Sequence, residues 1–425
     1  MQKIIDSLSE YYKKNTHVVD YDSSSRQKAF ARFIAKGIPS RKDEAWRYAN
    51  ITSWYKQNLQ QPEPNYTFSL LQEYSEIQPD ILVVDGFVQI LTENLGIDAM
   101  SLQDAIITYP EKVQDYVNKS QDNNLTDNPF VDFNAAAWSS GLFVDVKDNF
   151  KKPGSINIVY VNTGNFFLNN LNIIVLGKNA ELNIAEHYYG KNTYNVNNVT
   201  NIYLDTSANL THEILQQDGN DAIRQNYICV KQLSSSSYKQ RCYSFGAKFY
   251  RAETVVDFKE SNAEAEYVGV DFTTKDNWHA TNFKAIHNAS NCTSRQQFRS
   301  LVASVSSCSF LGHIFVPQGV EATAAYQDSK SLLLGQTARA NVKPYLEIFA
   351  DDVVCTHSAS IGNLDENSVF YLRARGYNQP LAYLVLLQAF VHELISVCTN
   401  EEIKSIAAKN LENLSSHVFL DGMYD

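Results

Sequence analysis

Apolar and polar positions alternate in three distinct patterns along the 425 residues. Near the start, apolar side chains recur at helical spacing, as in Ile4, Leu8 and Tyr11, and a second helical pattern begins at about Arg26. We therefore predict that the first hundred residues are mostly helical and that residues 1–130 form a mainly helical N-terminal region.

From about Asn157 to Phe349, short alternating or fully apolar runs replace the helical spacing. Strand-like runs include Ile156–Val161, Leu171–Leu176, Glu181–Glu186 and Thr254–Phe258. Several turns share a small polar pair followed by Ala, as in Asn262-Ala263, and no helical pattern separates the strands. This excludes βαβ units and leaves a coiled β-solenoid or a β-sandwich. The scarcity of hairpin-type Asn-Gly and Asp-Gly pairs favours the solenoid, which we assign to residues 131–362.

After Ile361 the spacing becomes helical again. A first helix is predicted from Asp365 to Arg375, ended by Gly376, and the capping-box pattern from Thr399 starts a last one. The helix between them carries an apolar stripe that must be buried: Leu387, Phe390, Val391, Leu394, Ile395 and Cys398. Residues 363–425 are thus predicted to form a C-terminal helical domain, either a cap on the β region or a docking module.

Composition narrows the choice of function. Lys and Arg number 36 against 47 Asp and Glu, a net charge of −11, which argues against a nucleic-acid partner. The longest apolar run, 381–391, is interrupted by Gln388 and is far below the ~20 residues that cross a bilayer, so we expect no membrane association. The first eight residues lack the apolar core of a secretory signal, and we expect a cytoplasmic protein.

Motifs of common enzymes are missing from the sequence. It contains no phosphate-binding GxxxxGK[ST] loop, dinucleotide GxGxxG, HExxH or GxSxG motif, and the six cysteines form no CxxC pair. A β-helix protein that binds or cleaves carbohydrate is one alternative, with Asp351-Asp352 as its carboxylates. Adjacent residues on a strand point to opposite faces, however, so these two carboxylates cannot converge on one bond. We therefore do not expect an enzyme.

The most suggestive chemistry lies in Val353-Val354-Cys355-Thr356-His357. On a strand, Cys355 and His357 project from the same face, a pair suited to a soft metal or a sulfur species. Two ligands are too few for a closed metal site, so a second chain would have to supply the others. The alternative is a buried structural cysteine beside a hydrogen-bonded histidine. Further Cys and His residues in the same β region are additional candidates: Cys292, Cys308, His279 and His287.

The stretch from Lys343 to Gly376 closely resembles the C-terminal signature of the SufB/SufD family of iron-sulfur cluster assembly proteins. Weaker similarities extend through 174–188 and 291–296. The segment Cys355-Thr356-His357-Ser358-Ala359-Ser360 is similar to Cys-Ser-His-Gly-Ala-Thr of the SufD branch and unlike Val-Glu-His-Glu-Ala of SufB. Glu44-Ala45-Trp46-Arg47-Tyr48 also resembles a SufD pattern.

The resemblance implies a mainly β fold, with a right-handed parallel β-helix core flanked by N-terminal and C-terminal helical regions. It also implies a non-catalytic subunit that pairs with SufB through the β-helix and binds the ABC-type ATPase SufC through the C-terminal region. Clusters would be assembled from iron and persulfide sulfur on that complex.

The same resemblance places Cys355 and His357 at the SufB interface, where they would bind iron or a nascent cluster transiently, with no permanently bound cofactor. Candidates for the SufC contact are Tyr371, Arg373, Arg375 and Gly376. Two alternatives within the family stay open, namely a SufB-like primary scaffold and, for the isolated chain, a homodimer.

Overall fold

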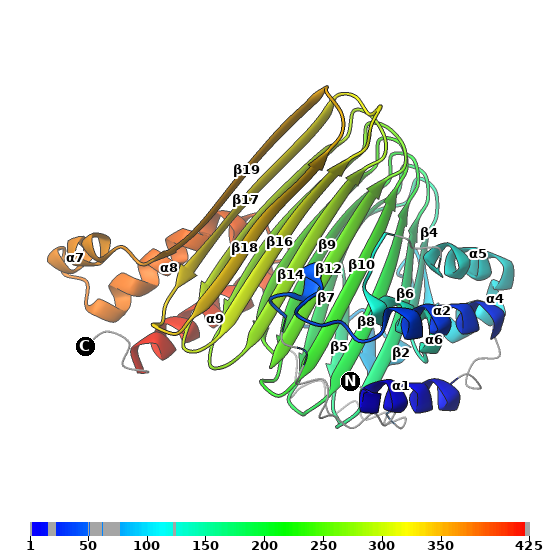
Figure 1. Cartoon of the computed structure of the whole chain (residues 1–425), viewed down its shortest axis with the longest axis horizontal. Helices are drawn as coiled ribbons and strands as arrows, with labels where there is room; N and C mark the ends of the chain where they lie inside the picture. Colours follow the sequence, from blue (N-terminus) through cyan, green and yellow to red (C-terminus); the bar gives the residue numbers. More distant parts are fainter. Residues whose placement is uncertain are drawn as a thin grey trace.

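The computed structural model describes residues 2–15, 23–49, 51, 62, 77–121 and 125–420. Its centre is a stack of β-strands in two sheets (Figure 1). The first sheet contains β1 (Ile81–Val84), β2 (Phe87–Ile90), β5 (Lys151–Asn162), β7 (Glu181–Gly190), β9 (Asn209–Asp218), β11 (Ser237–Gly246), β13 (Glu264–Thr273), β15 (Thr293–Val302), β17 (Thr323–Leu333) and β19 (Val353–Asn363). The second contains β3 (Asp98–Ser101), β4 (Leu142–Val146), β6 (Phe167–Leu176), β8 (Asn195–Leu204), β10 (Ile223–Gln232), β12 (Phe249–Phe258), β14 (Trp278–His287), β16 (Ser307–Val316) and β18 (Arg339–Ile348).

From β4 onward the chain passes from one sheet to the other at each successive strand, and the pairs that these strands form with one another are parallel. Glu181 pairs with Asn209, and Asn209 with Ser237, so one coil takes 28 residues in this part of the molecule. This is the predicted parallel β-helix, and the sandwich alternative is wrong. The domain boundaries after residues 130 and 362 stay predictions.

Tight turns explain how the coils stay in register. Asn179, Ser207 and Asn262 adopt left-handed backbone conformations, with φ of 54°, 58° and 66°. The residue after each is a fully buried alanine, because only a small side chain fits the inside of the bend. The N–H of Asn179 donates to the carbonyl of Thr206 in the next coil, 3.0 Å away, so the turns themselves form a ladder.

Helices cover the outer faces of both sheets (Figure 1). The N-terminal helices are α1 (Gln2–Asn15), α2 (Ser23–Lys36), η1 (Glu44–Trp46), α4 (Leu102–Thr108), α5 (Pro110–Gln121) and α6 (Pro129–Ala137), and the C-terminal ones are α7 (Glu366–Ala374), α8 (Gln379–Ser396) and α9 (Glu401–Leu420). Side chains of the first group pack on the second sheet, and those of α8 and α9 pack on the first. Strand β6 is covered on both faces and is buried at all ten positions, although three of its residues, Asn169, Asn170 and Asn172, are polar. No described helix is long and apolar enough to span a bilayer.

The region predicted to be mostly helical also contains strands β1, β2 and β3, which is a correction to that prediction. Strands β1 and β2 form an antiparallel hairpin whose turn residues, Asp85 and Gly86, have φ of 51° and 89°. An Asp-Gly pair between apolar runs is a strong hairpin signal, and it was available in the sequence. Strand β1 then pairs in parallel with β5, so this segment closes the first end of the solenoid.

The C-terminal helices begin and end close to the predicted positions. The Asp365 side chain accepts hydrogen bonds at the start of α7, and Gly376 follows that helix with a φ of 99°, which suits glycine. The apolar stripe on α8 is buried at Leu387, Val391 and Leu394. At α9 the capping side chain is that of Asn400, which accepts from Glu402 and Ile403 N–H groups, and Thr399 is not the capping residue.

The middle coils also bury charged groups in pairs. The Arg224 guanidinium makes two hydrogen bonds to Asp218, of 2.7 and 2.8 Å, and lies over the Tyr188 ring. Burial alone would raise the pKa of the Asp218 carboxyl, but the Arg224 charge and the hydrogen bonds from Arg224, Tyr194 and Gln216 together outweigh burial and lower it. Each buried charge is therefore stabilised by its charged partner and by neighbouring side chains.

Candidate functional site

Among the described residues, strand β19 is the last strand of its sheet and pairs only with β17. Its register aligns Cys355 with Ala325 and His357 with Gln327. Because partners in a parallel sheet point to the same side, and both Ala325 and Gln327 are buried, Cys355 and His357 face the same way as the solenoid interior. They are nevertheless accessible, because the described part of the chain has no further coil stacked on β19.

The predicted same-face geometry of Cys355 and His357 follows directly from this register. Cys355 is half-buried against an apolar cluster that includes Val353 and Ala350, whereas His357 is exposed. Burial raises the pKa of the Cys355 thiol, against a smaller opposing effect of the Ala325 backbone. The thiol is therefore protonated at neutral pH, and a metal ion or a nearby positive charge would be needed to make it a strong ligand.

The other candidate Cys and His residues do not join this pair. His279 contacts the Gly246 carbonyl at 2.7 Å and His287 contacts the Ser294 hydroxyl at 2.9 Å, so both rings have structural partners. Cys308 is buried beside Asp271. Cys292 occupies the small-residue position after the left-handed Asn291, where other turns have alanine. Among the described residues, no group of three or more His, Cys, Asp or Glu side chains could hold a metal ion.

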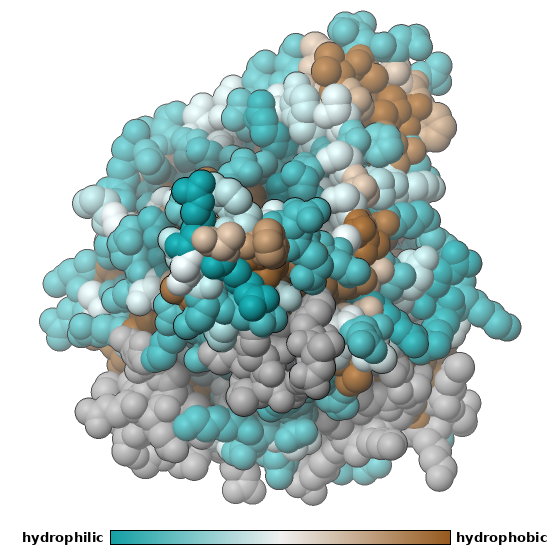
Figure 2. Space-filling model, turned by 90° about the vertical axis from the view of Figure 1, so that its left-hand side faces the viewer, coloured by the Kyte–Doolittle hydropathy of each residue, from teal (hydrophilic) through white to brown (hydrophobic). Residues whose placement is uncertain are grey.

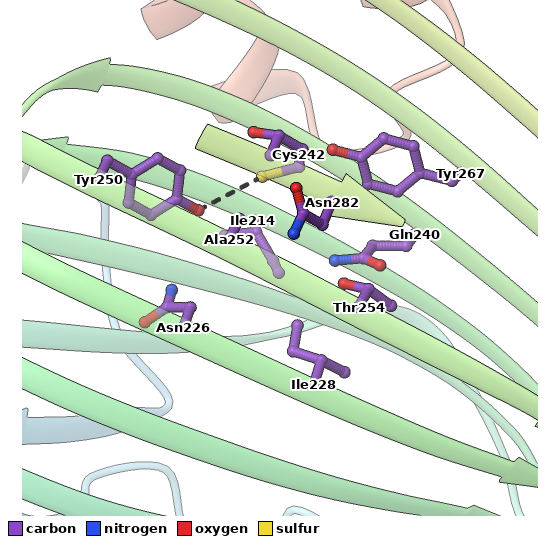
Figure 3. Close-up of a pocket in the computed structure, with 11 residues that line it drawn as sticks. Ile214, Asn226, Ile228, Gln240, Cys242, Tyr250, Ala252, Thr254, Tyr267 and Asn282 are labelled. Carbon is purple, nitrogen blue, oxygen red and sulfur yellow. Dashed lines mark hydrogen bonds between the residues drawn. The ribbon is translucent and has the colours of Figure 1, made fainter. Parts of the chain in front are cut away.

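The solenoid interior offers little space at the cavity drawn in Figure 3. There, Cys242, Tyr250 and Tyr267 point between the two sheets, and the Cys242 sulfur lies 3.8 Å from the Tyr250 hydroxyl. The cavity volume is about 10 Å³, which is about the space that one water molecule needs. A metal cluster or an organic substrate cannot fit in this cavity.

The two adjacent aspartates, Asp351 and Asp352, lie in the turn before β19 and not on a strand, so the predicted alternation of strand faces does not apply to them. The Asp352 side chain accepts a hydrogen bond from the Ala322 N–H at 2.9 Å and so braces the turn of the neighbouring coil. This is a structural role for Asp352. That the two carboxylates do not act as a pair stays a prediction.

Exposed apolar side chains surround the start of β19. Phe349, which directly follows β18, is 63% exposed, and Val354 on β19 is 59% exposed. Figure 2 shows an apolar patch at the top of its face, where the turn from β18 to β19 lies in Figure 1. Together with the unpaired edge of β19, this patch is a surface typical of protein-protein contacts.

A second exposed surface lies on α7 and the turn that follows it. Tyr371, Arg373, Arg375 and Gly376 are all exposed, and the Arg375 guanidinium lies 5.0 Å from the centre of the Tyr371 ring. Phe370, which sequence reasoning missed, is 73% exposed. In Figure 2, this helix projects toward the viewer, with apolar residues between strongly hydrophilic ones. We name Phe370, Tyr371, Arg373, Arg375 and Gly376 the α7 surface.

Comparison with known proteins identifies the family. Residues 159–390 match the family described as SUF system FeS cluster assembly, SufBD core domain. Residues 2–158 match the family described as SufBD protein N-terminal region. The chain belongs to the SufBD family. The resemblance noted in the sequence is thereby confirmed, and this SufBD protein is related to iron-sulfur cluster assembly.

Three relatives show how far the similarity of this SufBD protein extends. The iron-sulfur cluster assembly protein SufD of Escherichia coli is 24% identical over 401 residues, 90% of each chain. The Arabidopsis thaliana protein ABCI7, chloroplastic, is 26% identical over 396 residues, 88% of this chain and 82% of that protein. A SufBD family protein of Synechocystis is 28% identical over 298 residues, 67% of this chain and 65% of that protein. None of these names indicates a catalytic activity.

Proposed function

We propose that this SufBD protein is a non-catalytic, cytoplasmic subunit of an iron-sulfur cluster assembly complex. It would pair with a SufB-like protein through the open end of the β-helix. It would also bind a SufC-like ABC ATPase through the α7 surface. The ATPase would hydrolyse ATP, since this sequence has no phosphate-binding loop of the GxxxxGK[ST] type.

The observation that carries the proposal is the combination found on β19. No described strand pairs with its outer main-chain edge. Cys355 and His357, two side chains of types that can bind metal, lie on its inward-facing side and are accessible. A thiol and an imidazole are suitable donors to iron but need further ligands. A partner strand at this edge would bring those ligands within reach. The incomplete donor set and the unpaired edge therefore both support binding of a second protein at β19.

Iron or a nascent cluster would be a substrate here and would leave after assembly. The half-buried thiol of Cys355 favours such transient binding, because its raised pKa makes it protonated, and therefore a weak ligand, until a metal approaches. A second copy of this chain could occupy the same edge when no SufB-like partner is present, since the edge offers unpaired N–H and C=O groups.

The proposal is tested by anaerobic cluster assembly on the complex co-expressed with SufB-like and SufC-like proteins. We expect His357→Ala to reduce bound iron and sulfide at least tenfold, while size-exclusion chromatography still shows the complete complex. Ser360→Ala is the matched control, because Ser360 is exposed on the opposite face of the same strand. Normal iron and sulfide content in His357→Ala would contradict a role of His357 in cluster assembly, and this chain would then be only a structural subunit of the complex.

The ATPase contact is tested separately. Arg373→Glu reverses one exposed charge of the α7 surface and should weaken capture of the SufC-like protein at least tenfold in a pull-down. Pairing with the SufB-like protein should persist, because α7 lies outside β19. Unchanged SufC capture by both Arg373→Glu and Tyr371→Ala would contradict this assignment of the α7 surface.

A further inference from the structure

Two glutamine side chains are stacked in the coils that precede β19, in line with His357. The register aligns Gln296 on β15 with Gln327 on β17, and Gln327 with His357 on β19. Partners on adjacent parallel strands lie about 4.8 Å apart and point to the same side of the sheet. Gln296 and Gln327 are 1% and 5% exposed, whereas His357 is exposed. The column therefore runs from the interior to the open end of the solenoid.

The hydrogen bonds of the two glutamine amides run in one direction. Gln296 Nε2 donates to the His313 carbonyl at 3.5 Å, and because a carbonyl can only accept, this contact defines which end of the amide is nitrogen. Gln327 Nε2 in turn donates to Gln296 Oε1 at 3.2 Å. The other end of that amide, Gln327 Oε1, is a buried acceptor to which no described residue donates. The series thus ends on an unused carbonyl oxygen in the coil next to His357.

The opposite sheet leaves room for both amides. Gly312 on β16 faces them, and a Cβ atom at this position would lie 2.8 Å from Gln296 Oε1 and 3.0 Å from Gln327 Nε2. A larger residue would therefore displace at least one of the two side chains. The close approach of Gly312 and the hydrogen bond between the amides restrict their rotation, so Gln327 Oε1 is a preorganised acceptor.

We propose that Gln327 is a positioning residue for His357, and that its Oε1 accepts a hydrogen bond from one ring N–H of the imidazole. That N–H takes the place which the amide N–H of a further glutamine would have in a longer column. Because a neutral imidazole has one N–H, this bond fixes the tautomer and leaves the lone pair of the other nitrogen for a metal ion.

This inference rests on the proposed function, in which His357 binds iron. A histidine that binds a metal through one nitrogen usually donates its other N–H to a fixed acceptor, which orients the ring and makes it a stronger ligand. Gln327 would supply that acceptor from this chain itself, whereas the further iron ligands would come from the partner.

The first measurement is nitrogen NMR of the full-length chain with isotope-labelled histidine, without metal. It is made at about pH 8.5, where an ordinary imidazole with a pKa of ~6.5 is neutral. The signals of His357 are those that are missing from His357→Ala. In the native chain its two ring nitrogens should differ widely in chemical shift, as expected for a single tautomer.

Two substitutions of Gln327 test the origin of that signature. Gln327→Met keeps a side chain of similar length but removes the amide, so the two His357 shifts should move closer together as the tautomers exchange. Gln327→Glu restores an oxygen acceptor and should restore the wide separation. A merely structural role of Gln327 would not produce this loss and recovery.

The second measurement is the iron and sulfide content of the complex assembled anaerobically with SufB-like and SufC-like proteins. Gln327→Met should reduce both about tenfold, at the lower end of the ~10–100-fold effect of losing such a partner, while the complete complex still forms. Ser329→Ala is the matched control, because Ser329 is buried at the next inward position of β17 but is aligned with Ala359. It should leave both the tautomer and the iron content unchanged.

The inference is overturned if His357 exchanges between tautomers in the native chain, or if Gln327→Met leaves its tautomer unchanged. It is also overturned if Gln327→Met keeps a normal iron content while His357→Ala loses it. Normal iron content in His357→Ala would instead contradict the proposed function, and the tautomer measurement would still decide whether Gln327 orients the ring.

Discussion

The middle coils and the last coil of this β-helix share one strand register but differ in exposure. In β9 and β11, which have neighbouring coils on both sides, seven of the ten residues of each strand are buried. In β19, which has a neighbour on one side, side chains of the same inward parity are accessible. The difference comes from where the stacking stops and not from a change in local structure. Inward-facing side chains that could not reach a ligand in the middle of the stack can therefore reach one at its end.

The largest effect should follow from breaking a charge pair in a middle coil. Asp218→Ala leaves Arg224 buried without its carboxylate partner and should destabilise the protein by ~3–5 kcal/mol. Urea unfolding monitored by circular dichroism measures this change. Asp276→Ala, which breaks the exposed pair with Lys248, is the matched control and should cost ~0–1 kcal/mol. If the two variants lost the same free energy of unfolding, the buried pair in the middle coil would be no more important for stability than the exposed pair.

A loss of stability of intermediate size is expected when the pH is lowered, because the middle coils contain buried, uncharged histidines. Burial lowers the pKa of His187 to about 3 and that of His287 to about 4. Below pH ~6.5 the unfolded chain takes up protons at these residues, but the folded chain does not, so stability falls as pH decreases toward 4. From pH 7 to 5 the loss should be on the order of 1–2 kcal/mol for each histidine.

Urea unfolding at pH 7 and pH 5 measures that loss. His287→Gln should flatten the pH dependence, since one of the two imidazoles is gone. His392→Gln, on an exposed position of α8, is the control and should follow the native curve. A native-like slope in His287→Gln would show that the acid sensitivity has another origin.

The smallest stability effect is predicted for the last coil. His357→Ala and Thr356→Ala both change exposed side chains of β19 and should shift the unfolding free energy by no more than about 0.5 kcal/mol. Together with a loss of cluster content in His357→Ala alone, this would separate function from folding at the open end. A loss of more than ~2 kcal/mol in His357→Ala would instead indicate a structural histidine.

Much of the fold could be predicted because strand and turn signals are local. Each coil by itself contains two of these signals. One is the alternation of apolar and polar residues in the runs near residues 156 and 254, and the other is the small residue that follows each left-handed turn. The strands β1 to β3 were missed because a helical interpretation was extended over Asp85-Gly86. The role of Cys292 was not predicted, because its small-residue position in a turn becomes evident only when the turns are stacked.

The candidate site was predictable only in part, for a physical reason. The two-residue spacing of Cys355 and His357 determines that they share a face on any strand. Whether that face is covered depends on the absence of a further coil, which no local pattern encodes. Phe349 and Phe370 were missed for the same reason, since apolar residues are ordinarily expected inside.

The attachment of the C-terminal helices has a mechanical consequence. Glu213 on β9 accepts hydrogen bonds from the Thr399 and Asn400 N–H groups, and the Tyr243 hydroxyl on β11 donates to the Leu394 carbonyl at 2.9 Å. The 18 residues of α8 span ~27 Å between this anchor and α7. The helix is thus a stiff lever that is fixed to the middle of the solenoid. A force applied at α7 acts as torque on β9 and β11, and it also reaches the last coil, because only Leu364 and Asp365 separate β19 from α7.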